Sequence, residues 1–180
     1  MSSIRKLFRP GAGQVHQAFT AAFAEESIYP NDVVALSHTA PTSQGSSGVL
    51  EGKTLGLGDY IYVVLADTDD TGGVGCQLGV AVGKGINSVS DRTSVLGDVV
   101  AADNLLHIQT WGVTRLVQTD DTVAAGAVLT LSTSAGICAD ATTSLLENHV
   151  GVALLADEAY ARAAATDDTA GCRAFIRCAM

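Results

Sequence analysis

The sequence is poor in aromatic residues and in proline. Aromatic residues make up 5% of the 180 positions and there are three prolines, whereas 47% of the residues are hydrophobic. A core built from this chain must therefore be aliphatic, formed mainly by Val, Ala, Leu and Ile. The few aromatic rings also argue against a carbohydrate-binding module, because such modules usually stack sugar rings on Trp or Tyr.

Basic residues are also few. Ten Lys and Arg stand against nineteen Asp and Glu, which gives a net charge of −9. A surface of that sign repels nucleic acid and anionic membrane, because binding either one requires clustered Lys and Arg that displace counterions. We therefore expect no direct binding of nucleic acid or membrane, and we expect the partners to be proteins.

Long apolar runs and an export signal are missing as well. No stretch approaches the ~18–20 apolar residues of a membrane span, and the basic start of the chain is not followed by the apolar region of a signal peptide. The sequence predicts a soluble protein made in the cytoplasm. The four cysteines, Cys76, Cys138, Cys172 and Cys178, are accordingly expected to be free, buried thiols.

What the sequence does contain is typical of strands joined by tight turns. Gly occurs 19 times, charged residues make up only 16% of the chain, and β-branched residues are frequent. The pattern predicts an all-β fold, a mainly antiparallel small barrel or sandwich of the tulip-like kind. The expected strands span residues 32–37, 60–65, 78–82, 105–117 (one long strand or two broken ones), 127–131, 150–155 and 172–178.

The first 30 residues differ from the rest. Residues 1–13 carry three basic and no acidic side chains and end in a Pro-Gly-Ala-Gly sequence, so they predict an extended arm. Apolar residues between Val15 and Phe23 recur at helical spacing and predict a short helix, as does the Ala-rich segment 158–165. The expected organisation is an arm and helix over residues 1–30 and a β-rich domain over residues 31–180, which divides into related modules at 31–100 and 101–180.

Two internal echoes suggest that duplication. Thr-Asp-Asp-Thr occurs at residues 68–71, 119–122 and 166–169, each time beside a predicted strand. Residues 78–82, Leu-Gly-Val-Ala-Val, also resemble residues 150–154, Val-Gly-Val-Ala-Leu. The echoes are too irregular for a solenoid and indicate hairpins with similar acidic corners.

No motif for catalysis, cofactors or metal stands out. Residues 48–54 have one residue too few between their glycines for a phosphate loop, and residues 73–79 miss the dinucleotide fingerprint by one position. The acidic segment 67–72 lacks the final Glu of a helix–loop–helix calcium site, which leaves an acidic turn or a looser surface calcium site. The four histidines are isolated from metal-ligand partners. We predict a non-enzymatic protein with no cofactor.

From about Asp98 to the C-terminus a series of features follows in a fixed order: Trp-Gly-Val-Thr-Arg-Leu-Val at 111–117, a strand at 123–131, a glycine-containing hairpin at 132–136, Val-Gly-Val-Ala-Leu at 150–154 and a closing strand at 174–177. In this order of features the chain resembles the decoration, or cement, proteins of tailed-bacteriophage capsids. The resemblance covers about half of the chain. The long N-terminal region departs from the smallest members of that family.

The resemblance implies a virion structural protein on the capsid surface, bound to the major capsid protein and stabilising contacts between its subunits. It also implies a homo-oligomer, with a trimer favoured. In that role the arm is the expected protein-binding segment: basic residues would pair with acidic capsid surface and apolar residues would fill pockets. These residues are Ile4, Arg5, Lys6, Leu7, Phe8 and Arg9. Another virion component, such as a tail-tube, connector or fibre-base protein, is the alternative, and a hydrolase or carbohydrate-binding module is a weaker one.

Overall fold

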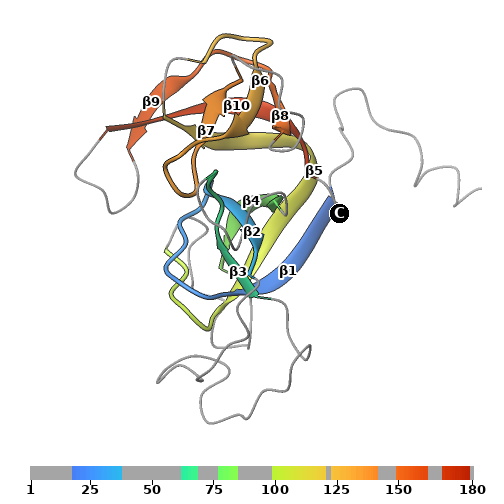
Figure 1. Cartoon of the computed structure of the whole chain (residues 1–180), viewed down its shortest axis with the longest axis vertical. Helices are drawn as coiled ribbons and strands as arrows, with labels where there is room; N and C mark the ends of the chain where they lie inside the picture. The colour runs from blue at the N-terminus through green and yellow to red at the C-terminus, as the bar shows by residue number, and fades with distance from the viewer. Residues whose placement is uncertain are drawn as a thin grey trace, which may run out of the picture.

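The computed structural model describes residues 18–37, 62–68, 77–84, 99–120, 123–141, 149–161 and 168–178. This part of the chain is built from strands and contains no helix, so the predicted all-β class is confirmed (Figure 1). The strands are β1 (Ala18–Ala24), β2 (Val33–Leu36), β3 (Tyr62–Leu65), β4 (Gln77–Lys84), β5 (Leu105–Thr119), β6 (Val128–Leu131), β7 (Cys138–Asp140), β8 (His149–Ala153), β9 (Glu158–Ala161) and β10 (Asp168–Arg177).

Both predicted helices are wrong where the structure describes them. Residues 18–24 form β1, which pairs with β5 and β3. In this strand Ala22 and Ala24 are buried while the residues between and before them are more exposed, a period of two rather than 3.6. The Ala-rich segment begins with β9, which pairs with the start of β10. In each case the backbone hydrogen bonds of a strand partner outweigh a weak helical preference.

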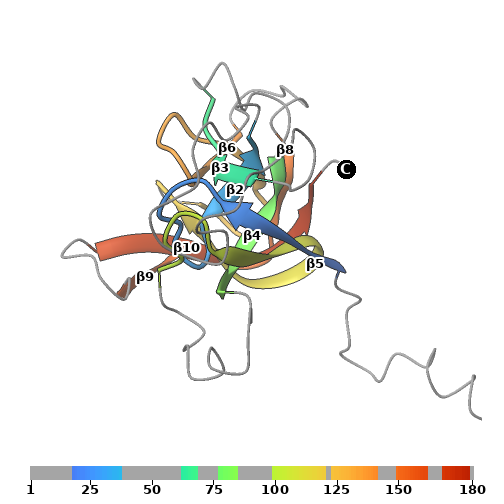
Figure 2. The ribbon, with the colours of Figure 1, turned by 90° about the horizontal axis from the view of Figure 1, so that it is seen from below.

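The strand pairings form two closed rings that share β5. One ring runs β1, β3, β2, β4 and back through β5 to β1, and the other runs β5, β7, β6, β8, β10 and back to β5. Pairing is mainly antiparallel, as predicted, but β1–β3 and β5–β7 are parallel, so the sheet is mixed. In Figure 1 β1 to β4 occupy the lower half of the molecule, β6 to β10 the upper half, and β5 runs through both; Figure 2 gives the same ribbon from below.

Each ring encloses its own aliphatic core. Leu106, Ile108 and Val63 lie in the first cluster, and Leu129, Ile176 and Val117 lie in the second. β5 therefore contributes to both clusters. β2 does so too, because Val33 and Ala35 belong to the second cluster whereas Val34 belongs to the first. The cores are aliphatic as the composition requires.

The long strand β5 is continuous but irregular. Gly112 has a φ of 103°, in the left-handed region that glycine adopts without strain. Further along, β5 has one more residue than β10 between Thr114 and Val117, which pair with Ala174 and Cys172. Such a bulge bends the strand and increases its twist. The bend lets one strand serve both rings.

The glycines of the two sequence echoes have equivalent surroundings. A Cβ added to Gly79 on β4 would lie 2.3 Å from the carbonyl oxygen of Gln109 on β5. A Cβ added to Gly151 on β8 would lie 2.3 Å from the carbonyl oxygen of Phe175 on β10. Each glycine lets a neighbouring strand approach closely. The echoes thus mark equivalent places in the two rings, while the division into modules at residue 100 stays a prediction.

Candidate protein-binding face

A row of apolar side chains crosses four strands on the outside of the second ring. Val128 on β6 pairs with Val152 on β8, Val152 pairs with Phe175 on β10, and Phe175 pairs with Val113 on β5. Directly paired residues point to the same side of a sheet. The neighbours of this row along each strand, such as Leu129, are buried in the core, so the row itself faces outward.

Two aromatic side chains extend the row toward the first half of the molecule. The Trp111 side chain meets Phe175 edge-on, with ring centroids 5.1 Å apart and an interplanar angle of 80°. On β1, Ala18 pairs with Trp111, and the following residue, Phe19, is exposed. Phe19 is 52% exposed, Trp111 38% and Val128 40%. We call this surface the outer apolar face; it comprises Phe19, Trp111, Val113, Val128, Val152 and Phe175.

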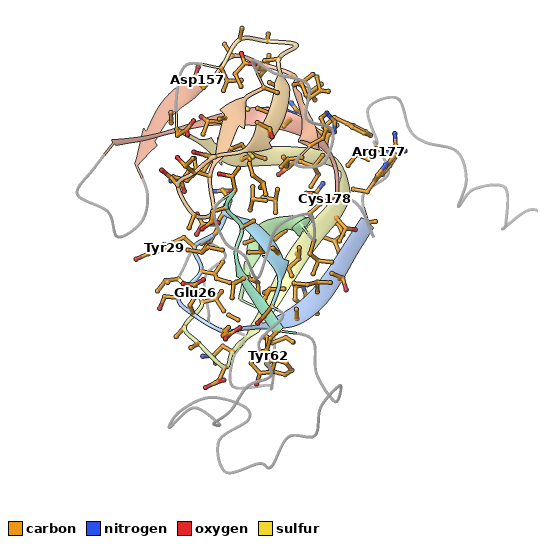
Figure 3. The ribbon with its side chains drawn as sticks, in the orientation of Figure 1. Glu26, Tyr29, Tyr62, Asp157, Arg177 and Cys178 are labelled. Atoms are coloured by element: carbon orange, nitrogen blue, oxygen red, sulfur yellow. The ribbon has the colours of Figure 1, made fainter. Side chains whose placement is uncertain are left out.

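Positive charge borders the outer apolar face. Arg173 and Arg177 are exposed and stand two residues before and after Phe175 on β10, so they point to the same side. Arg177 pairs with Trp111 in the strand register, and its side chain extends away from the ribbon in Figure 3. In a chain of net charge −9, these two side chains make the surroundings of Phe175 locally basic.

Polar side chains fix the backbone beneath Trp111. The buried Gln109 amide donates hydrogen bonds to the carbonyl oxygens of Trp111, at 3.3 Å, and Val113, at 3.1 Å. The Thr110 hydroxyl donates to the Ala18 carbonyl oxygen at 3.3 Å, and the backbone amide of Cys178 donates to the Thr110 carbonyl oxygen at 3.2 Å. These bonds tie β1, β5 and the end of β10 together where the aromatic rings emerge.

The predicted arm residues Ile4, Arg5, Lys6, Leu7, Phe8 and Arg9 lie outside the described residues. Cys76, His16 and His38 lie outside them as well, and so does the near-phosphate-loop segment 48–54. Of the acidic segment 67–72 only Asp67 and Thr68 are described. The arm as a binding segment therefore stays a prediction.

The three described cysteines are free and buried, all in the second core. Burial raises the pKa of the Cys172 thiol to about 11 and that of Cys178 to about 12. Burial, followed by the nearby thiols of Cys178 and Cys172, raises the pKa of Cys138 well above its usual value. A neutral buried thiol is a poor nucleophile, so these side chains act in packing.

Within the described ranges, His, Cys, Asp and Glu side chains form no group of three or more that could hold a metal ion. His107 is exposed on β5 and His149 is half-buried on β8. Among the same residues, no helix is long and apolar enough to cross a membrane.

The outer apolar face could not be assembled from the sequence. Its six residues come from five strands between positions 19 and 175, and most of them occur in short apolar runs that also supply the core. The one signal available was Trp111, the single tryptophan of the chain, which stands in a segment with strand-like alternation. The register of the strands decides which of the remaining residues join it.

Comparison of the chain with protein-family models, with curated proteins and with solved structures finds no match in any of the three.

Proposed function

We propose that this chain is a structural protein of a bacteriophage particle that binds the outside of the capsid and stabilises contacts between major capsid subunits. The observation that carries the proposal is the outer apolar face. Its side chains are exposed at Phe19, Trp111 and Val128 and half-buried at the other three positions. Aromatic and branched side chains that lie together in this way, rather than at scattered positions, are typical of a protein-binding surface.

The fold suits that role. We read the two closed rings as two small barrels that share β5. A closed ring satisfies the backbone groups of its strands and presents side chains on a rigid surface. Rigid presentation lowers the entropy lost on binding, which suits a protein that holds other subunits in place.

Attachment in this proposal is multivalent. The outer apolar face contacts the capsid, and the basic arm binds a neighbouring protein on the same lattice. On a lattice each contact raises the local concentration of the next, so weak contacts add up to stable occupancy. We propose a homo-oligomer, with a trimer as the favoured state, and no catalytic step.

The proposal is tested by the binding of the protein to empty capsids assembled from the cognate major capsid protein. Replacing Trp111 by Ser should weaken binding by roughly 30-fold, because a partly buried aromatic anchor at an interface is worth about 2 kcal/mol or more. Val99→Ser is the matched control, since Val99 is similarly exposed, at 40%, but lies away from the outer apolar face.

Capsids saturated with the protein should also survive heating that opens capsids lacking it, because a ligand that binds only the assembled state stabilises it by mass action. Equal binding of the Trp111→Ser and native proteins would show that the outer apolar face is not part of the interface. Capsids that are equally robust with and without the protein would overturn the cement role. Binding confined to tail components would favour the alternative virion role.

A further inference from the structure

One strand differs from all the others in its pairing. Among the described residues every strand of the two rings has a partner on each side, whereas β9 pairs only with β10. Its other edge therefore has backbone N–H and C=O groups that no described strand satisfies. A free edge of this kind is a template for pairing with a further strand.

The ribbon formed by β9 and the start of β10 also projects from the body. Both Figure 1 and Figure 2 show these two segments extending beyond the remaining strands. Asp168 and Thr169 pair with Ala161 and Tyr160 but with no residue of β5 or β8. A two-stranded ribbon is only marginally stable alone, and the addition of a third strand stabilises it.

The ribbon is acidic and the N-terminal arm is basic. The described residues of the ribbon, 158–161 and 168–171, contain Glu158 and Asp168 and no Lys or Arg, a net charge of −2. Residues 1–13 contain three Lys or Arg and no acid, a net charge of +3 without the terminal amine. Opposite charge steers two segments together and sets their register, while the strand hydrogen bonds supply the affinity.

We infer that the free edge of β9 binds the arm of a second copy of this chain, with residues 4–9 added to the ribbon as a third strand. The partner of the arm is then a neighbouring copy rather than the capsid. The inference does not depend on the capsid role, because it concerns the contact between copies alone.

The distance that the arm would have to cover explains the choice of a second copy. Ala18, at the start of β1, and Arg177, at the end of β10, lie on opposite sides of Trp111. Along β10, Gly171 at the near end of the ribbon is six positions from Arg177, about 20 Å, and Asp168 is nine positions away, about 30 Å. Arg9 is nine positions from Ala18 and can lie at most ~30 Å from it. To reach the outer edge of its own β9, the arm would also have to cross from β1 over β5, β10 and β9, about 5 Å for each strand spacing, so it would have little slack.

The inference is tested on the full-length chain by sedimentation at a series of concentrations. The native protein should associate, and the variant with Arg5, Lys6 and Arg9 all replaced by Ser should associate at least tenfold more weakly. A synthetic peptide of residues 1–13 should dissociate the native assembly by taking the place of the arm on β9. Hydrogen exchange should then show that the amides of Glu158–Ala161 stay protected while the assembly dissociates.

Proline substitutions separate strand addition from a charge effect. Amides of adjacent residues in a strand point to opposite edges, so Tyr160→Pro and Ala161→Pro remove donors from different sides of β9. One of the two should block association while the melting temperature of the unassociated chain is unchanged, because a proline on a free edge removes no internal hydrogen bond. The other should lower the melting temperature.

Three results would overturn the inference. The first is an assembly that neither proline affects. The second is a chain that stays monomeric at all concentrations while the amides of β9 are protected from hydrogen exchange. That result would show that the arm folds back on its own ribbon. The third is a peptide that binds capsids but not the chain, which would place the arm on the capsid and leave the proposed capsid role intact.

Discussion

At the scale of single residues, burial controls the chemistry of the chain more than residue type does. Cysteine is a potential nucleophile, yet Cys138, Cys172 and Cys178 are all enclosed in the second core, where the charged thiolate is disfavoured. Trp111 is the opposite case. The largest hydrophobic side chain of the sequence stays 38% exposed because Gly112 and the Gln109 amide hold the backbone beneath it.

The raised thiol pKa values predict a loss of stability in alkaline solution. The folded state keeps protons on these thiols that the unfolded state releases, so the stabilisation is complete below the ordinary thiol pKa and is lost as pH rises from about 9 toward 11. Each such thiol contributes a slope of up to about 1.4 kcal/mol per pH unit. Urea unfolding at several pH values should show this fall.

The variant Cys138→Ala is the control for that prediction. It lowers stability at every pH because it leaves a cavity, but its stability should fall less steeply above pH 9 than that of the native chain. Tyr and Lys titrate equally in both proteins and cancel in the comparison. Parallel curves would mean that Cys138 ionises as easily in the folded chain as in the unfolded one.

At the scale of the strands, close approach between backbones accounts for features that sequence patterns only hinted at. The Leu-Gly-Val-Ala-Val and Val-Gly-Val-Ala-Leu segments became β4 and β8, and the glycine of each faces a carbonyl oxygen of the next strand. The two similar five-residue segments thus reflect the same requirement, a glycine where a neighbouring strand approaches closely, at one place in each ring.

The close approach of β8 and β10 at Gly151 predicts that Gly151→Ala destabilises the fold. The added methyl group would lie 2.3 Å from the Phe175 carbonyl oxygen, so β8 and β10 must move apart, at a cost of roughly 1–3 kcal/mol. Chemical denaturation provides the measurement. Ala125→Ser, at an exposed position, should be nearly neutral; a Gly151→Ala chain as stable as this control would show that the strands can separate freely.

Strand prediction succeeded where the pattern was strong. Seven predicted strands correspond to β2, β3, β4, β5, β6, β8 and β10 within a few residues. The short β7 was missed because Cys138–Asp140 offers three residues, too few to show alternation. β1 and β9 were predicted as helices because alanine-rich sequence fits both periods, and only the pairing with β5 and β10 distinguishes them.

At the scale of the whole molecule, β5 makes the two halves depend on each other. Its first residues, including Leu106 and Ile108, fill the first core, and Val117 fills the second. Neither ring can close without β5, so unfolding of one ring removes a wall of the other. We therefore expect one cooperative transition rather than two.

Paired core substitutions test that expectation. Leu106→Ala in the first core and Leu129→Ala in the second should each cost about 2–5 kcal/mol, and each should shift the single transition without splitting it. Calorimetry should give equal calorimetric and van't Hoff enthalpies for both variants. Leu155→Ala, at a residue that is 55% exposed, is the control. A second transition in either variant would show that the rings unfold independently.

The sequence by itself determined the composition of the core, the all-β class and most strand positions, because these depend on local alternation and on glycine-rich turns. It also determined the charge contrast between the arm and the rest of the chain. Only the tertiary structure decided that the strands close two rings around β5, that Phe19, Trp111 and Val128 share one outer face, and that no described strand pairs with the second edge of β9. These features depend on register and on pairing between residues up to 93 positions apart, such as Ala18 and Trp111. A one-residue change of register reverses which side chains face outward, and no local pattern in the sequence records that choice.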